Sequence, residues 1–282
     1  MREIKNLREM YLFSQKAKNH GKKVGFVPTM GALHEGHLSL VAEAKKKADV
    51  VVVSIFVNPI QFAPNEDFAH YPRNLRHDKK LLKNHDIDAL FLPEASKILP
   101  EDFKTFVEVE GLSKKLCGRS RPAHFRGVTT IVAKLFNIVA PDVVFFGEKD
   151  FQQQLIIRQL IKDLNLSIEL VSVPIVREYD GLAMSSRNSR LSSHERKAAA
   201  IIYKALSIAQ EEIERGEKDI NKIVFRLRSL IGSEPVVRID YLMVVNPETL
   251  EEAKQAKGKI LLAIAAHVGK TRLIDNLLID AR

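Results

Sequence analysis

The feature that most constrains the fold is a short apolar run, DVVVVSIFVN, that lacks the alternation of a half-exposed strand. Five of the six residues from Val50 to Ile55 are apolar, which is typical of a parallel strand covered on both faces. Before this run, KKVGFVP predicts another short strand, and apolar residues recur on one helical face over residues 34–48. The three segments together predict a βαβ unit.

The alternation of strands and helices continues along the chain. Further strands are expected at residues 87–93, 105–110, 141–147 and 167–176, and helices at 78–84, at 128–139 and from Phe151 onward. This order predicts an α/β fold with a doubly wound parallel sheet. Ligands of such sheets bind beyond the carboxyl ends of the strands.

The character of the sequence changes after Val176. A polar, turn-forming segment covers residues 177–190, and Ser192 and Glu195 then form a capping box that opens a helix ending at Gly216. A helix over 219–231 and strands over 237–245 and 259–268 predict a smaller α+β unit. We therefore predict two domains, residues 1–176 and 177–282.

Composition excludes several classes of protein. Cys117 is the single cysteine among 282 residues, so an intrachain disulfide and a cysteine-based zinc site are both excluded. The N-terminus carries no secretory apolar segment, and the apolar runs are too short to span a bilayer. We expect a cytoplasmic protein without a membrane partner. Its net charge of +9 fits an anionic partner: a nucleic acid, a nucleotide or an acidic metabolite.

The segment VPTMGALHEGH (27–37) is the most informative stretch of the chain. It places His34 and His37 on one face of a first helical turn, just after a strand. Phosphate binds at helix N-termini, and imidazoles with near-neutral pKa donate hydrogen bonds there in a charged or nearly charged form. An ordinary capped helix start remains an alternative. A zinc site is disfavoured because the spacing is HExH, and neither GxGxxG nor GxxxxGK[ST] occurs here.

Polar residues also follow other predicted strands. Lys149 suits a phosphate, Asp150 a ribose or Mg²⁺, and Gln153 a hydroxyl or carboxylate. Gln61 follows the strand at 50–55, and residues 184–188, MSSRN, form a flexible loop suited to closing over a triphosphate. Each feature also fits an ordinary cap or loop. Their shared position at strand ends and in the loop between the domains favours one nucleotide site.

A basic cluster lies between two predicted elements. Arg119, Arg121, His124 and Arg126 could face an anionic substrate or RNA, or be solvated. Because no aromatic-rich RNA motif accompanies them, we do not predict a nucleic-acid partner.

Five motifs, PTMGALHEGH, SIFVNPIQF, RPAHFRGV, GEKDFQQ and DGLAMSSRN, together resemble the pantoate–β-alanine ligase family, in that order and across nearly the whole chain. This family belongs to the nucleotidyltransferase superfamily, whose HIGH and KMSKS signatures have modified counterparts here in HEGH (34–37) and MSSR (184–187). The resemblance implies a Rossmann-like N-terminal domain that binds ATP and pantoate, a smaller C-terminal domain that covers the active site, and a homodimer.

The resemblance also implies a reaction. ATP and pantoate form pantoyl adenylate and pyrophosphate, and β-alanine then displaces AMP to give pantothenate. Mg²⁺ accompanies ATP, with ligands that the sequence does not identify. A different small-molecule nucleotidyltransferase would share the histidine motif, but it would not need two glutamines that face the acyl acceptor.

The implied site residues fall on the quoted motifs. His34, His37, Lys149 and Arg187 are expected to be catalytic, with His37 as a proton donor. Pantoate is assigned to Gln61 and Gln153, and β-alanine to Gln61. The residues assigned to ATP are Met30, Gly31, Ala32, Leu33, His34, Glu35, Gly36, His37, Gly147, Glu148, Lys149, Asp150, Val176, Met184, Ser185, Ser186 and Arg187.

Overall fold

The structure is a computed structural model that describes residues 1–64 and 66–281. Arg282, the last residue of the predicted second domain, lies outside the described residues. The chain divides into two compact units. The first contains Met1–Lys114, Arg121–Glu148 and Gln152–Pro174, and the second contains Lys115–Ser120, Lys149–Phe151 and Ile175–Arg282. The second unit thus includes three short stretches from outside the predicted C-terminal domain, residues 115–120, 149–151 and 175–176.

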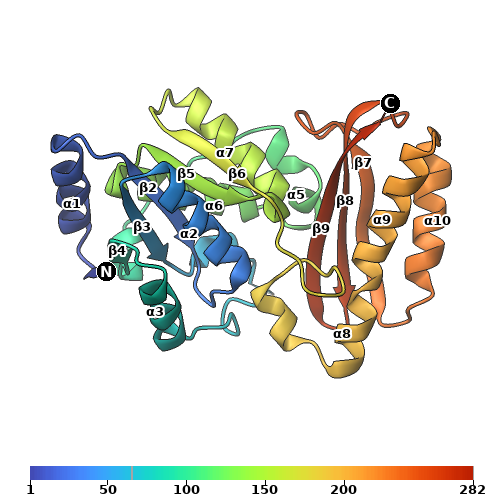
Figure 1. Ribbon diagram of the computed structural model, residues 1–282, viewed down its shortest axis with the longest axis horizontal. Helices are drawn as coiled ribbons and strands as arrows, with labels where there is room; N and C mark the ends of the chain where they lie inside the picture. Colours follow the sequence, from blue (N-terminus) through green and yellow to red (C-terminus); the bar gives the residue numbers. More distant parts are fainter. Residues whose placement is uncertain (65, 282) are drawn as a thin grey trace. The chain divides into compact units, whose positions relative to one another are not determined.

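A six-stranded sheet forms the centre of the first unit, in the order β1-β4-β3-β2-β5-β6 (Figure 1). All of its neighbouring strands are parallel, which confirms the predicted α/β fold class. The strands are β1 (Arg2–Ile4), β2 (Val24–Thr29), β3 (Val50–Ile55), β4 (Ala89–Phe91), β5 (Val143–Gly147) and β6 (Glu169–Val173).

Helices cover both faces of this sheet. Helix α2 contacts β2, β3, β5 and β6, whereas α1 and α6 contact each other and β2. Successive residues of β3, such as Val51 and Val52, are both buried, as the unbroken apolar run predicts. The helices and 3₁₀-helices of this part are α1 (Leu7–Asn19), α2 (Glu35–Lys47), η1 (Pro59–Gln61), α3 (Leu75–Asn84), α4 (Ala95–Ile98), η2 (Leu112–Lys114), α6 (His124–Val139) and α7 (Phe151–Asp163). Between β5 and α7 lies η3 (Glu148–Asp150), of which Lys149 and Asp150 belong to the second unit.

The prediction of a strand at residues 105–110 is wrong. This segment joins no sheet, and backbone groups in it bond instead to side chains of α6. The amide of Val107 donates to Thr130 Oγ1 over 2.9 Å, and its carbonyl accepts from Thr129 Oγ1 over 2.6 Å. Two hydroxyls thus take the place of a neighbouring strand.

The order in which the chain adds strands to the sheet reverses at β2, although all neighbouring strands are parallel. The chain moves from β2 outward to β3 and β4, and returns on the other side of β2 with β5. The pairing of β2 with β3 runs over the whole of β2, whereas its pairing with β5 joins Gly25 to Val143 and Phe26 to Val144 and stops there. In open α/β sheets, ligands bind at such a switch point, beyond the carboxyl ends of the strands.

The second unit has an antiparallel sheet, β7 (Val237–Val245), β8 (Gly258–Val268) and β9 (Thr271–Ala281), in the order β7-β8-β9. Helices α9 (Ile201–Glu214) and α10 (Ile220–Gly232) lie side by side and contact this sheet (Figure 1). The predicted capping box of Ser192 and Glu195 is present. The single helix predicted from there to Gly216 is in fact two, α8 (Ser193–Ala199) and α9, which meet at Ala200.

Helix α5 (Cys117–Ser120) attaches to the sheet of the second unit. The thiol of Cys117 lies 3.2 Å from the hydroxyl of Tyr241 on β7, and Lys115 Nζ donates to the carbonyl of Thr249 over 2.7 Å. Across the described residues of the whole chain, no helix is both long and apolar enough to cross a membrane.

Gly127 gives the first testable prediction. A Cβ atom at this position of α6 would overlap the carbonyl oxygen of Ile60 in η1. Because backbone cannot yield as a flexible side chain does, Gly127→Ala should lower the free energy of unfolding by about 1–3 kcal/mol. Gly232→Ala is the matched control, since nothing lies within 4 Å of its added Cβ. Urea denaturation of both variants checks this, and equal stability would contradict the tight approach of α6 to η1.

Candidate active site

The turn that follows β2 leads into the first histidine motif. Thr29 is buried, and its hydroxyl donates to the carbonyl of Ser54 on β3 over 2.8 Å and accepts from the amide of Gly31 over 3.2 Å. Gly31 and Ala32 then adopt positive φ angles of 81° and 50°. This tight turn brings the chain to His34, the N-cap residue of α2.

His34 and His37 form a reciprocal capping box. His34 Nδ1 accepts from the amide of Gly36 over 3.2 Å, and His37 Nδ1 accepts from the amide of His34 over 3.4 Å. The ring centroids are 4.1 Å apart. A ring nitrogen that accepts a hydrogen bond carries no proton, so the N–H of each ring is on Nε2. In this geometry the two imidazoles cap the helix, and each carries an N–H on Nε2 at the same helix N-terminus.

Gln61 lies beside this turn within the first unit. Its Nε2 is 3.0 Å from Met30 Sδ, and its Oε1 accepts from Asn58 Nδ2 over 3.0 Å. Asn58 is buried at the end of the segment that follows β3, where it also donates to the carbonyl of Gly127 over 3.0 Å. The structure thus brings together the motifs after β2 and β3.

Two residues of the basic cluster hold the backbone of Gln61. His124 Nδ1 donates to the carbonyl of Gln61 over 2.9 Å, and Arg121 Nη2 donates to the same oxygen over 3.4 Å. Arg121 also makes two 2.5 Å bonds to the carboxylate of Glu66. Burial favours the protonated form of Glu66, but the hydrogen bonds and charge of Arg121 bring its pKa below the usual value. None of these groups is an ordinary solvated charge.

The other two residues of the cluster have partners of their own. Arg119 is exposed and lies 3.5 Å from the carboxylate of Glu252, and the guanidinium of Arg126 covers the ring of Phe106 at 4.1 Å. Arg119, Arg121 and Arg126 are thus each paired with a carboxylate or an aromatic ring.

The end of β5 supplies the next set of predicted residues. Gly147 closes the strand, opposite Val173 of β6, and Glu148 follows it in a partly exposed position. Gln153 lies in the first turn of α7 and is also partly exposed, whereas its neighbour Gln152 is buried and donates to the carbonyl of Leu112 over 2.8 Å. Of these two glutamines, Gln153 is therefore the one open to a ligand.

Lys149 belongs to the second unit, where its ammonium group donates to the carbonyl of Met184 over 2.8 Å. Its own carbonyl accepts from Asn276 Nδ2 of β9 over 3.0 Å. Burial lowers the pKa of Lys149, and the charges of Asp150 and Asp275 oppose this effect. The lysine is thus tied by both its side chain and its backbone to the MSSR segment and to β9.

The MSSR segment is part of a hairpin. The amide of Met184 donates to the carbonyl of Val176 over 3.0 Å, and the amide of Glu178 donates to that of Leu182 over 2.8 Å. Ser185 then caps the 3₁₀-helix η4 (Ser186–Arg190) by accepting from the amide of Arg187 over 3.2 Å. The loop expected to be flexible therefore has regular backbone hydrogen bonds on both sides of Met184.

Ion pairs anchor this hairpin. Arg196 reaches Glu178 and Asp180 with 2.5 Å bonds, and its hydrogen bonds lower the pKa of Asp180. Arg177 makes two bonds, of 2.6 and 3.0 Å, to Asp275, a residue only 2% exposed. Burial raises the pKa of Asp275, and Arg177 opposes this effect. No local pattern signals these partners, since charged residues in a turn are usually solvated.

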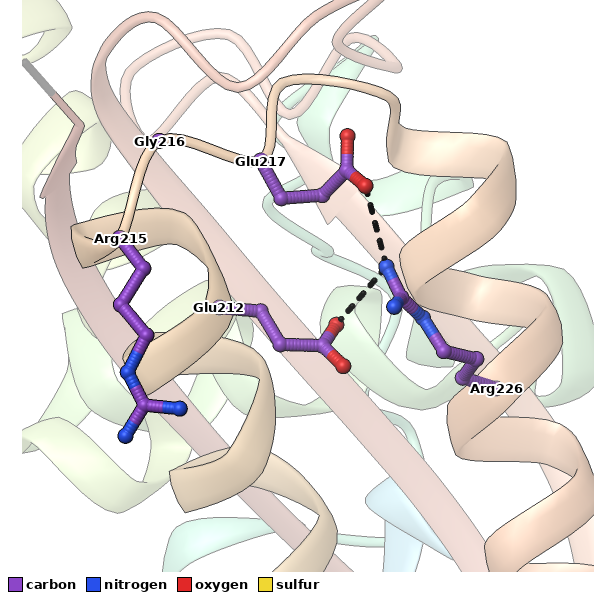
Figure 2. A pocket seen from close by; sticks show the side chains of 5 residues that line it. All are labelled: Glu212, Arg215, Gly216, Glu217 and Arg226. Atoms are coloured by element: carbon purple, nitrogen blue, oxygen red, sulfur yellow. Dashed lines mark hydrogen bonds and ion pairs between the residues drawn. The ribbon is translucent and has the colours of Figure 1, made fainter.

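A pocket at the turn between α9 and α10 contains none of the predicted site residues. Figure 2 shows its lining, Glu212, Arg215, Gly216, Glu217 and Arg226. Arg226 Nη2 lies 3.3 Å from the carboxylate of Glu212 and 3.1 Å from that of Glu217. The guanidinium is thus occupied by two carboxylates, and we do not assign a ligand here. Residues 1–64 and 66–281 contain no group of three or more His, Cys, Asp or Glu side chains able to hold a metal ion.

The parallel sheet, its switch point and the histidine-capped helix beyond β2 define a Rossmann-like α/β enzyme. The chain belongs to the pantoate–β-alanine ligase family, whose family model matches residues 1–278.

Relatives and solved structures agree with this family. The pantothenate synthetases of Thermosipho melanesiensis and Caldicellulosiruptor bescii are 52% and 51% identical over 279 residues, which is 99% of each chain. A Thermus thermophilus pantothenate synthetase structure has a TM-score of 0.94 at 43% identity and covers 98% of this chain and 99% of its own. A Francisella tularensis pantoate–β-alanine ligase structure, complexed with beta-gamma ATP and β-alanine, has a TM-score of 0.83 at 36% identity, with 99% and 97% covered.

Proposed function

We propose that the protein condenses pantoate with β-alanine in two steps, through a bound pantoyl adenylate, with cleavage of ATP to AMP and pyrophosphate. The observation that carries this proposal is the pair of capping imidazoles at the carboxyl end of β2. Family membership supports it, as does the ligand pair in the Francisella tularensis structure.

The histidines serve the first step. A carboxylate oxygen of pantoate attacks the α-phosphorus of ATP, the bond from that phosphorus to the bridging oxygen breaks, and pyrophosphate leaves with the electron pair. Negative charge accumulates on the phosphate oxygens during this step. Nε2–H donors of His34 and His37, together with the N-terminus of α2, stabilise that charge more in the transition state than in the ground state.

Lys149 and Arg187 supply positive charge to the phosphates in the same proposal. The remaining residues of segments 30–37, 147–150 and 184–187, and the backbone of Val176, contact ATP. Mg²⁺ bound with ATP would neutralise phosphate charge. The exposed carboxylate of Asp150 suits the ribose or this ion.

The two glutamines bind the acid. Gln61 and Gln153 hydrogen-bond pantoate, and Gln61 also lies near β-alanine. In the second step the neutral amine of β-alanine attacks the acyl carbon, the carbon–oxygen bond breaks so that AMP leaves with the electron pair, and the new amide nitrogen loses one proton. The adenylate is already activated, so this step requires mainly that the amine be held beside it. The bonds from Asn58, Arg121 and His124 support this role, because they fix both the side chain and the backbone of Gln61.

We infer that the protein works in the cytoplasm as a homodimer, without nucleic acid. The resemblance to the ligase family supports the homodimer. The single cysteine supports the cytoplasm, and the individual partners of the basic side chains support the inference on nucleic acid. Light scattering on the purified protein measures the oligomeric state directly.

The test is pyrophosphate release from ATP and Mg²⁺ in the presence of D-pantoate. Without β-alanine we expect a burst of one turnover per site, because the adenylate stays bound. With β-alanine we expect sustained turnover and formation of pantothenate. Folded protein that releases no pyrophosphate in either case would overturn the proposal. Release with a different carboxylic acid would instead identify another nucleotidyltransferase.

A further inference from the structure

A buried carboxylate lies under the turn that precedes the histidines. Asp78, in the first half of α3, is 1% exposed. Its Oδ2 accepts from the amide of Ala32 over 3.0 Å, and its Oδ1 accepts from the amide of Leu33 over 2.8 Å. The two oxygens therefore bind two successive amides of the turn, and the proposed reaction has not used this residue.

The backbone held by Asp78 is strained. Ala32 has a φ of 50°, in the left-handed region that a residue with a Cβ atom rarely adopts, and Gly31 before it has a φ of 81°. A Cβ atom on Gly31 would lie 3.0 Å from Asp78 Oδ2, so the carboxylate fills the space directly beneath the turn. Two charge-assisted bonds offset the cost of this conformation.

This turn sets the position of both imidazoles. Leu33 is followed at once by His34, whose amide donates to His37 Nδ1 and whose own Nδ1 accepts from Gly36. The direction in which the chain leaves Leu33 therefore fixes the N-cap residue and, through it, the second ring. Asp78, on helix α3, holds the chain in that direction through its two hydrogen bonds.

We propose that Asp78 is a positioning residue for His34 and His37: by holding the amides of Ala32 and Leu33, it aligns the two imidazoles for the phosphates of the nucleotide. Asp78 touches no reacting atom and acts through the turn. The kinetic part of the proposal rests on the proposed ligase function.

The test compares two isosteric variants. Asp78→Asn replaces one acceptor oxygen by an NH₂ group, which cannot accept from a backbone amide. Asp88→Asn is the matched control, because Asp88 Oδ2 also accepts from a backbone amide, that of Val51 at the start of β3, over 2.8 Å. That bond lies at the amino end of the sheet. We expect kcat for pyrophosphate release to fall about 10–100-fold in Asp78→Asn and to change less than about twofold in Asp88→Asn.

A double-mutant cycle separates positioning from general destabilisation. If Asp78 acts through the histidines, Asp78→Asn should lower kcat less in a His37→Ala background than in the wild type, because only His34 is then left to be positioned. The variant Asp78→Glu keeps both acceptor oxygens and should recover part of the activity. A full, independent loss in the His37→Ala background would overturn the proposal.

Imidazole ¹⁵N NMR of the whole protein tests the same proposal without any activity. In the wild type, His34 and His37 should show protonated Nε2 and hydrogen-bonded, unprotonated Nδ1, with the signals assigned from single histidine variants. Asp78→Asn should shift these signals and Asp88→Asn should not. Unchanged signals in Asp78→Asn would refute the positioning role. A wild-type protein inactive with pantoate would refute only the proposed function.

Discussion

His37→Ala is expected to slow the formation of pantoyl adenylate by roughly 10²–10³-fold while the protein stays folded. The substitution removes an Nε2–H donor from the place where charge develops, and it also removes the acceptor for the amide of His34. Loss of one cap costs a helix about 0.5–2 kcal/mol, which is too little to unfold a domain of this size. Rapid-quench measurement of the burst without β-alanine isolates the affected step.

His20→Ala is the matched control for this variant. His20 also caps a helix end, with Nδ1 bonded to the carbonyl of Lys16 over 2.7 Å, but at the exposed C-terminus of α1. Its removal should leave the burst unchanged. Near-wild-type adenylate formation in His37→Ala, from folded protein, would disprove the role that we propose for this residue.

The largest effect on stability is expected at Asp275. Asp275→Ala leaves the guanidinium of Arg177, which also lies 4.1 Å from the ring centroid of Tyr203, without its carboxylate partner. Breaking a buried ion pair by removing one partner costs about 3–5 kcal/mol. We therefore expect a decrease of this size in the free energy of unfolding, measured by urea denaturation.

Two further variants test whether the loss of stability comes from the Arg177–Asp275 ion pair. Glu211→Ala breaks an exposed pair with Arg215 at the end of α9 and should cost less than about 1 kcal/mol. The double variant Arg177→Met with Asp275→Leu removes both charges and should be more stable than Asp275→Ala alone. If the double variant were the less stable, the Arg177–Asp275 pair would not be the source of the loss.

Local patterns in the sequence predicted the elements that carry the candidate site. The apolar run at 50–55, the strand before the histidines and the helix after them all form as expected. These features depend on residues close together in the chain, so periodicity and capping residues suffice to find them. The prediction of a strand at 105–110 was wrong because it depends on residues farther along the chain. The hydroxyls of Thr129 and Thr130 bond to the backbone of this segment, and no local pattern shows such bonds.

The residues that hold the candidate site in place could not be predicted from local patterns. Asp78 was expected only as the start of a short polar helix, and α3 in fact begins three residues earlier, at Leu75. Its bonds to Ala32 and Leu33 depend on the fold bringing α3 beneath the turn. Asp275 likewise lies on β9, a strand that sequence patterns missed, and meets Arg177 only in the folded second unit.

The position of β2 in the sheet has a consequence for the order in which the chain folds during synthesis. One edge of β2 finds its partner β3 soon after translation, because residues 24–55 are local to one another. The other edge stays unpaired until residues 143 and 144 have left the ribosome. Its pairing then requires the closure of a long loop, which is slow. Until then a nascent chain exposes the unpaired edge of its central strand, the kind of surface on which chaperones act and from which misassembly begins.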